Sequence, residues 1–225
     1  MYRVEDKYVL PATDFWLLRN RIETILSPDS NSNDDGYKIS SVYFDDILDT
    51  HLRDTVDGNP IRQKYRIRIY NDSFDVIKLE VKFKQYNRIL KRAQKISVAE
   101  FEKLLNCETI DAPDDLDNAR NLFNLAIMER GLRPKVIVTY ERRAFIYTPG
   151  NVRITFDSNL RGSTQFKYFG NKNLVYEYPE GSGAVLEVKY DEFLPKFIAQ
   201  TLEINSMWQT ANSKYRICRE IFENL

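Results

Sequence analysis

Histidine and cysteine are scarce in this chain of 225 residues, which contains one His and two Cys. A single histidine excludes sites built from several histidines and leaves a histidine general base without a partner. Cys107 and Cys218 lie far apart and match no metal-binding spacing, so they predict reduced thiols rather than a structural disulfide. The sequence also lacks a Gly-rich phosphate loop, so we expect any bound phosphate to be contacted by side chains.

Long hydrophobic runs and an excess of charge of either sign are also absent. No apolar run approaches the roughly 20 residues needed to cross a bilayer, and residues 1–7 are charged rather than signal-like. These absences predict a cytoplasmic protein without a membrane span. The 33 Lys and Arg are balanced by 33 Asp and Glu, so no global basic field indicates a nucleic-acid partner. A basic site must therefore arise by sorting charges in space.

Aromatic residues are abundant: fourteen Tyr and thirteen Phe stand against eight Gly, which favours strands. Residues 1–225 are expected to form a single domain. We predict an α+β fold, an antiparallel eight-stranded closed β-barrel with helices packed outside and a C-terminal helix. The alternation of residue types predicts strands near 2–10, 37–45, 60–70, 74–84, 87–97, 134–147, 151–160 and 184–190. Cap signals and apolar spacing predict helices from Thr13 or Asp14 to about Leu26, at 97–105, at 115–130, and in two pieces after 193.

Three residues outside these strands receive structural interpretations. His51 is predicted to be a surface residue of a turn at 49–54. Trp16 and Trp208 are predicted to lie on amphipathic helices and to pack in the core.

Charged residues gather on one face of several predicted strands. Glu80 and Lys82 are two residues apart, as are Glu5 with Lys7 and Glu187 with Lys189. In residues 64–70, cations and hydrophobic residues alternate strictly. Because successive side chains of a strand point to opposite faces, each charged set shares one face. We expect the apolar faces to pack outward under helices and the charged faces to line a lumen. The alternative, that the charged faces are exposed to solvent, stays open at this point.

The predicted lumen is strongly cationic, with fourteen Lys and Arg against Glu5, Glu80, Asp157 and Glu187. Because unpaired buried charges are costly, this excess predicts a compensating polyanion. A chain of phosphates fits, since Arg binds two phosphate oxygens at once and Lys adds a point charge. The carboxylates suit a hard divalent cation that bridges phosphate oxygens. The fourteen cations are Arg3, Lys7, Lys64, Arg66, Arg68, Lys78, Lys82, Lys84, Arg88, Arg92, Arg142, Arg153, Lys189 and Lys214.

Seven short motifs give the chain a resemblance to a known family. They are Glu5-Asp6-Lys7-Tyr8, Ser41-Val42-Tyr43-Phe44-Asp45, Arg66-Ile67-Arg68, Leu79-Glu80-Val81-Lys82, Tyr140-Glu141-Arg142-Arg143, Leu186-Glu187-Val188-Lys189-Tyr190 and Ser213-Lys214-Tyr215. In this order they resemble the VTC domain, the polyphosphate-polymerase branch of the triphosphate tunnel metalloenzymes, whose relatives include CYTH phosphatases and RNA triphosphatases. The resemblance covers essentially the whole chain.

The two ends of the motif series favour the polymerase branch. The final Ser-Lys-Tyr is similar to that branch, whereas the hydrolase relatives usually open with Glu-x-Glu-x-Lys. Arg3 stands here in place of the first Glu. That change removes a carboxylate able to bind metal or activate water, and is compatible with a transferase.

The resemblance implies a tunnel that binds ATP and polyphosphate along its axis and transfers the γ-phosphate to the growing chain, with Mn²⁺ or Mg²⁺. It makes Glu187 the first choice for the metal. Glu5 and Glu80 are alternatives that can instead orient a neighbouring Lys or Arg. Together with the charged faces, it assigns catalytic roles to Arg66, Arg68, Arg142 and Lys214, and phosphate binding to Lys7, Lys82, Arg92, Tyr140, Arg153, Lys189 and Ser213.

Two other functions remain open on the sequence alone. One is hydrolysis of a nucleoside triphosphate or tripolyphosphate in the same tunnel. The other is a non-catalytic module that binds polyphosphate or inositol phosphates. Groove-type RNA binding fits less well, because the cations alternate with aliphatic residues and form no aromatic stacking platform. The sequence also leaves open a membrane-protein partner, the preferred nucleotide and the oligomeric state.

Overall fold

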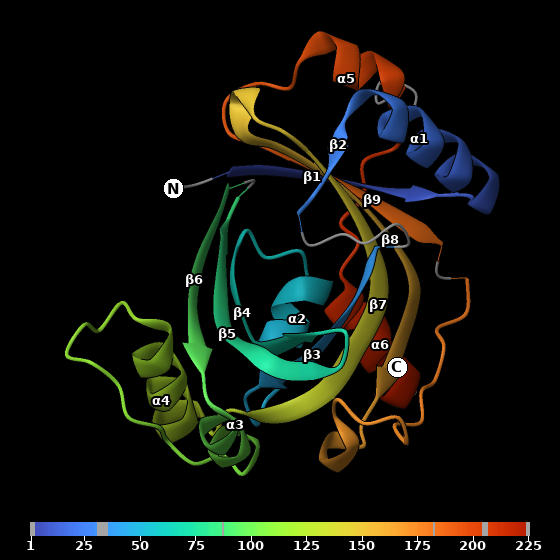
Figure 1. The fold of residues 1–225 in the computed structure, drawn as a ribbon. Coiled ribbons are helices and arrows are strands. Elements are labelled where there is room, and N and C mark those ends of the chain that lie inside the picture. Colours follow the sequence, from blue (N-terminus) through green and yellow to red (C-terminus); the bar gives the residue numbers. More distant parts are fainter. Residues whose placement is uncertain (1–2, 31–35, 87, 182, 204–206, 224–225) are drawn as a thin grey trace.

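The protein is built around a sheet that closes on itself (Figure 1). The structure is a computed structural model that describes residues 3–30, 36–86, 88–181, 183–203 and 207–223. Its antiparallel strands follow the order β7-β3-β4-β5-β6-β1-β9-β8, and β8 pairs back to β7. The predicted closed eight-stranded barrel is therefore confirmed. These strands are β1 (Arg3–Leu10), β3 (Tyr37–Asp45), β4 (Ile61–Tyr70), β5 (Ser73–Gln85), β6 (Arg88–Ile96), β7 (Arg133–Tyr147), β8 (Val152–Ser163) and β9 (Ala184–Tyr190), and the short β2 (Ser27–Pro28) pairs with β7 outside the ring.

Helices cover the outside of the barrel, as predicted (Figure 1). At one end α1 packs against α5, β1 and β9, while α3 and α4 lie against β5. The C-terminal helix α6 packs against β7, β8 and α2. No described helix has the length and apolar character of a membrane span. The helices are α1 (Ala12–Ile25), α2 (Thr50–Val56), α3 (Val98–Leu105), α4 (Ala119–Arg130), α5 (Lys196–Thr201) and α6 (Lys214–Glu223), with short 3₁₀ turns at Pro149–Asn151 and Phe166–Tyr168.

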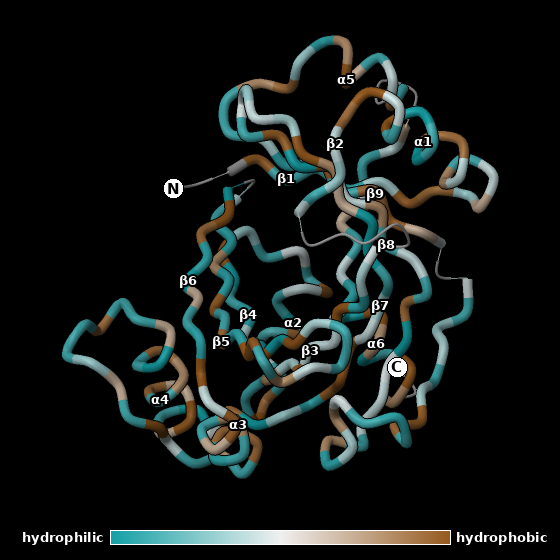
Figure 2. The backbone as a smooth tube through the Cα atoms, in the orientation of Figure 1, coloured by the Kyte–Doolittle hydropathy of each residue, from teal (hydrophilic) through white to brown (hydrophobic). Residues whose placement is uncertain are grey.

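Strand β5 shows how alternation sorts the two faces of the barrel wall. Leu79 and Val81 are fully buried in a cluster that includes Phe123 of α4. Glu80, which lies between them, and Lys82, which follows Val81, belong to the opposite face. Figure 2 shows hydrophilic and hydrophobic residues alternating along the strands of the wall. The hydrophobic core thus lies between barrel and helices, and the charged faces turn inward.

Strand register brings the inward charges of neighbouring strands opposite one another. Arg66 of β4 lies opposite Glu80 of β5, and Lys7 of β1 lies opposite Glu187 of β9. Tyr43 of β3 lies opposite Arg66 on its other side. Because directly opposed side chains are near neighbours, this register pairs much of the inward charge within the wall.

Local signals place some helix ends correctly and others not. Ser97 and Glu100 form the predicted capping box at the start of α3, and Gly131, at φ 63°, ends α4 in the left-handed conformation that glycine adopts without strain. The predicted cap of the first helix by Thr13 or Asp14 is wrong. Helix α1 begins after Pro11, without a side-chain cap.

The predicted turn at 49–54 is also wrong, because α2 begins at Thr50 and His51 is buried. The cause is a contact from outside the segment. The Asp45 carboxylate, at the end of β3, accepts hydrogen bonds from the backbone N–H groups of His51 and Leu52. No signal within the segment itself indicates that contact.

Both tryptophans lie at the surface, contrary to the prediction. Trp16 is 56% exposed on α1, whose buried face is formed by Phe15, Leu18 and Ile22. Trp208 is 89% exposed and precedes Gln209, which forms a β-bridge with Tyr8, so it does not lie on a helix.

The outward core predicts a clear difference between two leucine variants. Leu79→Ala should lower the free energy of unfolding by about 2–5 kcal/mol, because it leaves a cavity in a fully buried cluster. Leu116→Ala is the control, since Leu116 is 81% exposed and its loss should change stability by less than about 0.5 kcal/mol. Denaturant unfolding measures both. Equal effects would contradict the placement of the core outside the barrel.

Candidate functional site

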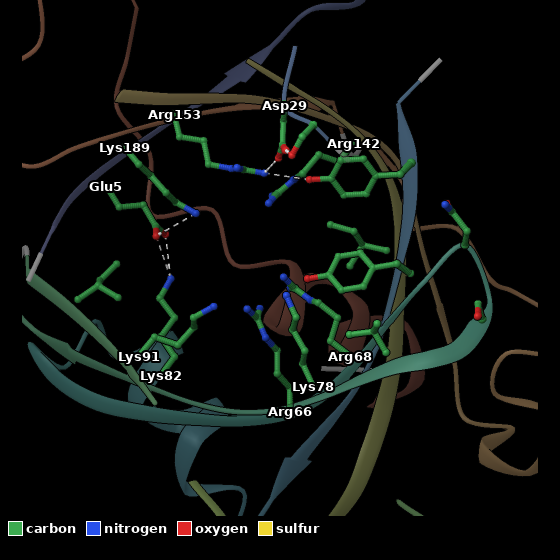
Figure 3. A pocket seen from close by; sticks show the side chains of 18 of the residues that line it. Glu5, Asp29, Arg66, Arg68, Lys78, Lys82, Lys91, Arg142, Arg153 and Lys189 are labelled. Atoms are coloured by element: carbon green, nitrogen blue, oxygen red, sulfur yellow. Dashed lines mark hydrogen bonds and ion pairs between the residues drawn. The ribbon is translucent and has the colours of Figure 1, made fainter. Parts of the chain in front are cut away.

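A passage lined by charged side chains runs through the barrel. Two cavities, of about 820 and about 400 Å³, adjoin one another and share seven lining residues. Figure 3 shows the larger one, with side chains from opposite walls pointing into a common space. Among the described residues, thirteen Lys and Arg line the two cavities, against five Asp and Glu. The seven shared residues are Glu5, Arg66, Arg68, Lys82, Ile89, Arg142 and Lys189.

The structure gathers nearly all of the predicted site residues in this tunnel. Glu80 does not line either cavity, but it contacts tunnel cations from within the wall. Arg92 alone lies elsewhere. The side chain of Arg3 lies outside the described part of the chain. The predicted residues that line the tunnel are Glu5, Lys7, Arg66, Arg68, Lys82, Tyr140, Arg142, Arg153, Glu187, Lys189, Ser213 and Lys214.

Glu187 lies at the centre of a group of four cations. Its oxygens are 3.1 Å from Lys189 Nζ and 3.2 Å from both Lys7 Nζ and Lys214 Nζ, and 3.4 Å from an Arg142 nitrogen. Burial alone would raise the pKa of Glu187, but these neighbouring charges outweigh it and hold the pKa well below its usual range. The carboxylate is therefore ionised at neutral pH.

Glu5 bridges two cations from different strands. Its carboxylate is 2.9 Å from Lys82 Nζ and 3.4 Å from Lys189 Nζ. Burial lowers the pKa of Lys82 to about 8, because attraction by Glu5 only partly offsets burial and repulsion from Lys7. Lys82 is thus a tunnel cation whose charge changes near neutral pH.

Two further carboxylates fix arginines in the wall. Glu80 is 1% exposed and lies 2.6 Å from Arg66 and 3.0 Å from Lys91 Nζ. Asp157 holds Arg142 through two hydrogen bonds of 2.6 Å, one from Nε and one from Nη2. Such bidentate contact fixes the plane of a guanidinium, so the remaining donors face a set direction.

Tyrosine rings form part of the same wall. Tyr43 accepts a hydrogen bond from Arg66 Nη1 at 2.9 Å, and Tyr140 accepts one from Arg68 Nη2 at 3.3 Å. Lys214 Nζ lies 4.9 Å from the centre of the Tyr140 ring. The predictions included Tyr140 as a site residue but missed Tyr43. Register at β3–β4 could have found Tyr43, since it lies directly opposite Arg66.

The predicted tunnel position of Arg92 is wrong. Its β5 partner is Val81, a core residue, and its guanidinium contacts Asp117 on the outside. Lys91 pairs with Lys82 and lines the tunnel instead. Strand β6 carries cations on both faces, so the sequence alone did not fix which face turns inward. The same shift leaves Arg88 out of the lining residues.

The smaller cavity contains two of the predicted lumen cations, Lys64 and Lys84, and one cation that the sequence analysis missed, Arg62. Arg62, Lys64 and Lys84 line it beside the segment 209–213. Lys64 Nζ donates to Ser213 Oγ at 2.7 Å. Burial, together with repulsion from Lys7 and Lys82, holds the pKa of Lys64 well below its usual range. A phosphate oxygen there would raise this pKa and favour the charged form of the lysine.

The donor set fits a metal that arrives together with phosphates. Within the described residues, no group of three or more His, Cys, Asp and Glu could hold a metal ion. Mg²⁺ and similar hard cations are commonly held by one or two carboxylates plus substrate phosphates and water. Glu187, with Glu5 as an alternative, can supply that carboxylate. Glu80 fits less well, because it is enclosed in the wall by Arg66 and Lys91.

Because Lys91 faces the tunnel and Arg92 faces outward, substitutions of these two adjacent residues should affect phosphate binding differently. Lys91→Met should weaken tripolyphosphate binding about fivefold, because it removes a tunnel charge that contributes about 1 kcal/mol to the binding free energy. Arg92→Met is the matched control and should leave affinity unchanged, since its side chain lies outside. Calorimetric titration gives both constants. Weaker binding for Arg92→Met alone would contradict the register.

The lowered pKa of Lys82 predicts that the protein takes up protons when it binds a chain of phosphates. With a pKa of about 8, this lysine is half neutral at pH 8 in the free protein, and phosphate charge will raise that pKa. Protons are therefore taken up on binding above pH 8, and affinity falls as pH rises through that value. Titrations in buffers of different ionisation enthalpy measure the uptake. Lys82→Arg, which stays charged, should reduce it. An unchanged uptake in that variant would assign the effect to other groups or to the ligand.

Solved structures of other proteins share this fold. The PH1819 protein of Pyrococcus horikoshii OT3 aligns with a TM-score of 0.52 and 15% identity, covering 97% of this chain and 99% of that one. A candidate adenylate cyclase from Bacillus halodurans aligns with a TM-score of 0.56 and 15% identity, covering 95% of this chain and 96% of that one. HpAC1 from Hippeastrum is described as having a dominant triphosphatase activity. It aligns with a TM-score of 0.52 and 13% identity, covering 97% of this chain and 95% of that one. At these identities the likeness shows the fold alone.

Sequence comparison gives the family. Comparison with curated proteins found no match. The family model of the VTC domain, in contrast, matches residues 2–223. That match spans all eight barrel strands, both walls of the tunnel and the helix that carries Lys214. The chain therefore belongs to the VTC domain family.

Proposed function

We propose that this chain is a metal-dependent polyphosphate polymerase that transfers the γ-phosphate of ATP to a polyphosphate chain inside the tunnel, with residues 1–225 acting as one domain. The observation that carries this proposal is the pair of adjoining cavities lined by thirteen cations inside the barrel. A linear polyanion matches both its shape and its charge. Membership of the VTC domain family supports the same activity.

The tunnel residues act mainly by position and charge. Arg66, Arg142 and Lys214 are each fixed by carboxylates in the wall, so their donors are oriented before substrate arrives. Arg68 is held by Ser41 Oγ and Tyr140. Phosphoryl transfer gains chiefly from alignment of the reacting oxygens and from stabilisation of charge on the transferred group. These four side chains would supply that stabilisation.

The phosphates are expected to be bound along the passage by the remaining tunnel cations. Lys7, Lys82 and Lys189 surround Glu5, and Arg153 contacts Asp29 and Tyr37 at one end. Phosphate oxygens would compete with these carboxylates for the same cations. Tyr140 and Ser213 add polar contacts beside Lys214.

The arrangement favours an acceptor that is already ionised. A terminal phosphate oxygen needs no general base, whereas water does. Each of the inward carboxylates Glu5, Glu80, Asp157 and Glu187 contacts at least two cations. Such pairing lowers the basicity of a carboxylate. A phosphate acceptor therefore suits this tunnel better than water.

A divalent cation bound with the substrate would neutralise charge on the phosphate oxygens. Glu187 is the side chain proposed to hold it, and Mn²⁺ or Mg²⁺ fits the oxygen ligands. Hydrolysis of a triphosphate is the second candidate, because HpAC1, which shares the fold, is described as a triphosphatase.

Incubation of the purified protein with ATP and Mn²⁺ separates the two candidates. The proposal predicts long phosphate chains on a gel, with little free phosphate. Glu187→Gln should lower chain synthesis at least tenfold, whereas Glu102→Gln, on the exposed side of α3, should not change it. Free phosphate without chains would establish hydrolysis instead. Undiminished Mn²⁺ stimulation in Glu187→Gln would remove that residue as the metal ligand.

A further inference from the structure

A buried carboxylate behind the tunnel wall is connected to the tunnel through one tyrosine. Asp45 ends β3 and is fully buried, outside the lining of either cavity. Resting on the proposed function of the tunnel, we propose that Asp45 is a positioning residue that acts through the Tyr215 hydroxyl to set the place of Lys214 among the phosphates.

The Asp45 carboxylate is rigidly placed. One oxygen accepts hydrogen bonds from the backbone N–H groups of Asp46 and His51, at 2.9 and 3.0 Å. The other accepts from the Leu52 N–H at 2.9 Å and from the Tyr215 hydroxyl at 2.5 Å. Two of these four contacts tie it to the start of α2, and one ties it to the neighbouring residue Asp46. The fourth reaches across to Tyr215, near the start of α6.

Tyr215 is positioned by contacts of both its ring and its hydroxyl. The ring stacks on Tyr43, with centroids 5.1 Å apart and planes at 22°. The hydroxyl donates to Asp45 and accepts from Arg219 Nη1 at 2.9 Å. Tyr43 in turn accepts a hydrogen bond from Arg66, a tunnel arginine. The position of Tyr215 is thus set from behind by Asp45 and from the front by the tunnel wall.

Lys214 and Tyr215 are the first two residues of α6, and their side chains are anchored in different places. Lys214 Nζ lies in the tunnel, 2.7 Å from Asp157 and 3.2 Å from Glu187. Adjacent side chains on a helix point about 100° apart, so two anchors on adjacent residues fix both the position and the rotation of the first turn. The preceding residue, Ser213, accepts hydrogen bonds from Lys64 and from the Arg216 N–H.

The anchor matters because Lys214 shares both of its acidic partners in the tunnel with other cations. Glu187 is shared with Lys7, Arg142 and Lys189. Arg142 also competes for Asp157. These like charges repel Lys214 at short range. If a metal and phosphates occupy Glu187, Lys214 loses one of its two acidic partners. The contact between Tyr215 and Asp45 is independent of the tunnel charges, and so keeps Lys214 in place when they rearrange.

A double-mutant cycle with tripolyphosphate as the probe tests this role. Tyr215→Phe keeps the stacked ring and removes only the hydroxyl. We expect it to weaken binding about three- to tenfold in the otherwise unchanged protein, and less than about twofold in a Lys214→Met background. Tyr65→Phe is the matched control, because its buried hydroxyl donates to Gln63 Oε1 away from the tunnel, and affinity should not change.

Three outcomes would overturn the proposal. Equal weakening by Tyr215→Phe in both backgrounds would show a general structural effect. An unchanged affinity in Tyr215→Phe would show that the hydroxyl does not position Lys214. If Tyr215→Phe loses cooperative unfolding, Asp45→Asn replaces it in the same cycle, and additivity there is equally decisive. The readout is binding, so absence of chain synthesis would defeat the proposed function and leave this test intact.

Discussion

The structure depends on one electrostatic constraint, which is that more cations than carboxylates face the inside of a closed barrel. The wall tolerates this because Glu5, Glu80, Asp157 and Glu187 are each placed against at least two cations. Glu187 and Glu5 each serve at least three of them. Pairing is incomplete, however, since thirteen cations but only five Asp and Glu among the described residues line the passage. Burial of unpaired charge is costly, so the remaining cations constitute an affinity for anions built into the fold.

Much of this could be predicted from the sequence because strand periodicity is local. Alternation in β4, β5 and β9 assigned Arg66, Lys82 and Lys189 to one face, and closure of the barrel turned that face inward. The prediction for strand β6 failed because lysine and arginine occupy both of its faces. Only pairing with β5 decides whether Lys91 or Arg92 faces the tunnel. The prediction of a turn at 49–54 failed because the Asp45 carboxylate, just outside that segment, stabilises the start of α2. The error with Trp208 arose because a hydrophobic residue need not be buried.

The carboxylates connect stability to chemistry. Their pairing with Lys and Arg stabilises the tunnel wall and orients the cations toward its interior. The same pairing lowers the basicity that activation of water would require. A metal entering with the phosphates would find single carboxylates rather than a complete protein site, since no described group of three acids, histidines or cysteines could hold one. This pairing of the carboxylates with cations supports the proposed transfer to an acceptor that carries its own ionised oxygen.

The central claim is that the passage is built for a linear chain of phosphates, and dependence of affinity on chain length tests it most directly. Dissociation constants would be measured at one pH and ionic strength for orthophosphate, pyrophosphate, tripolyphosphate and longer linear chains. Each added phosphate should contact further cations along the passage, so the account predicts that affinity rises stepwise at least through tripolyphosphate and then levels off. Equal affinity for all of these ligands, or no binding of any, would contradict it.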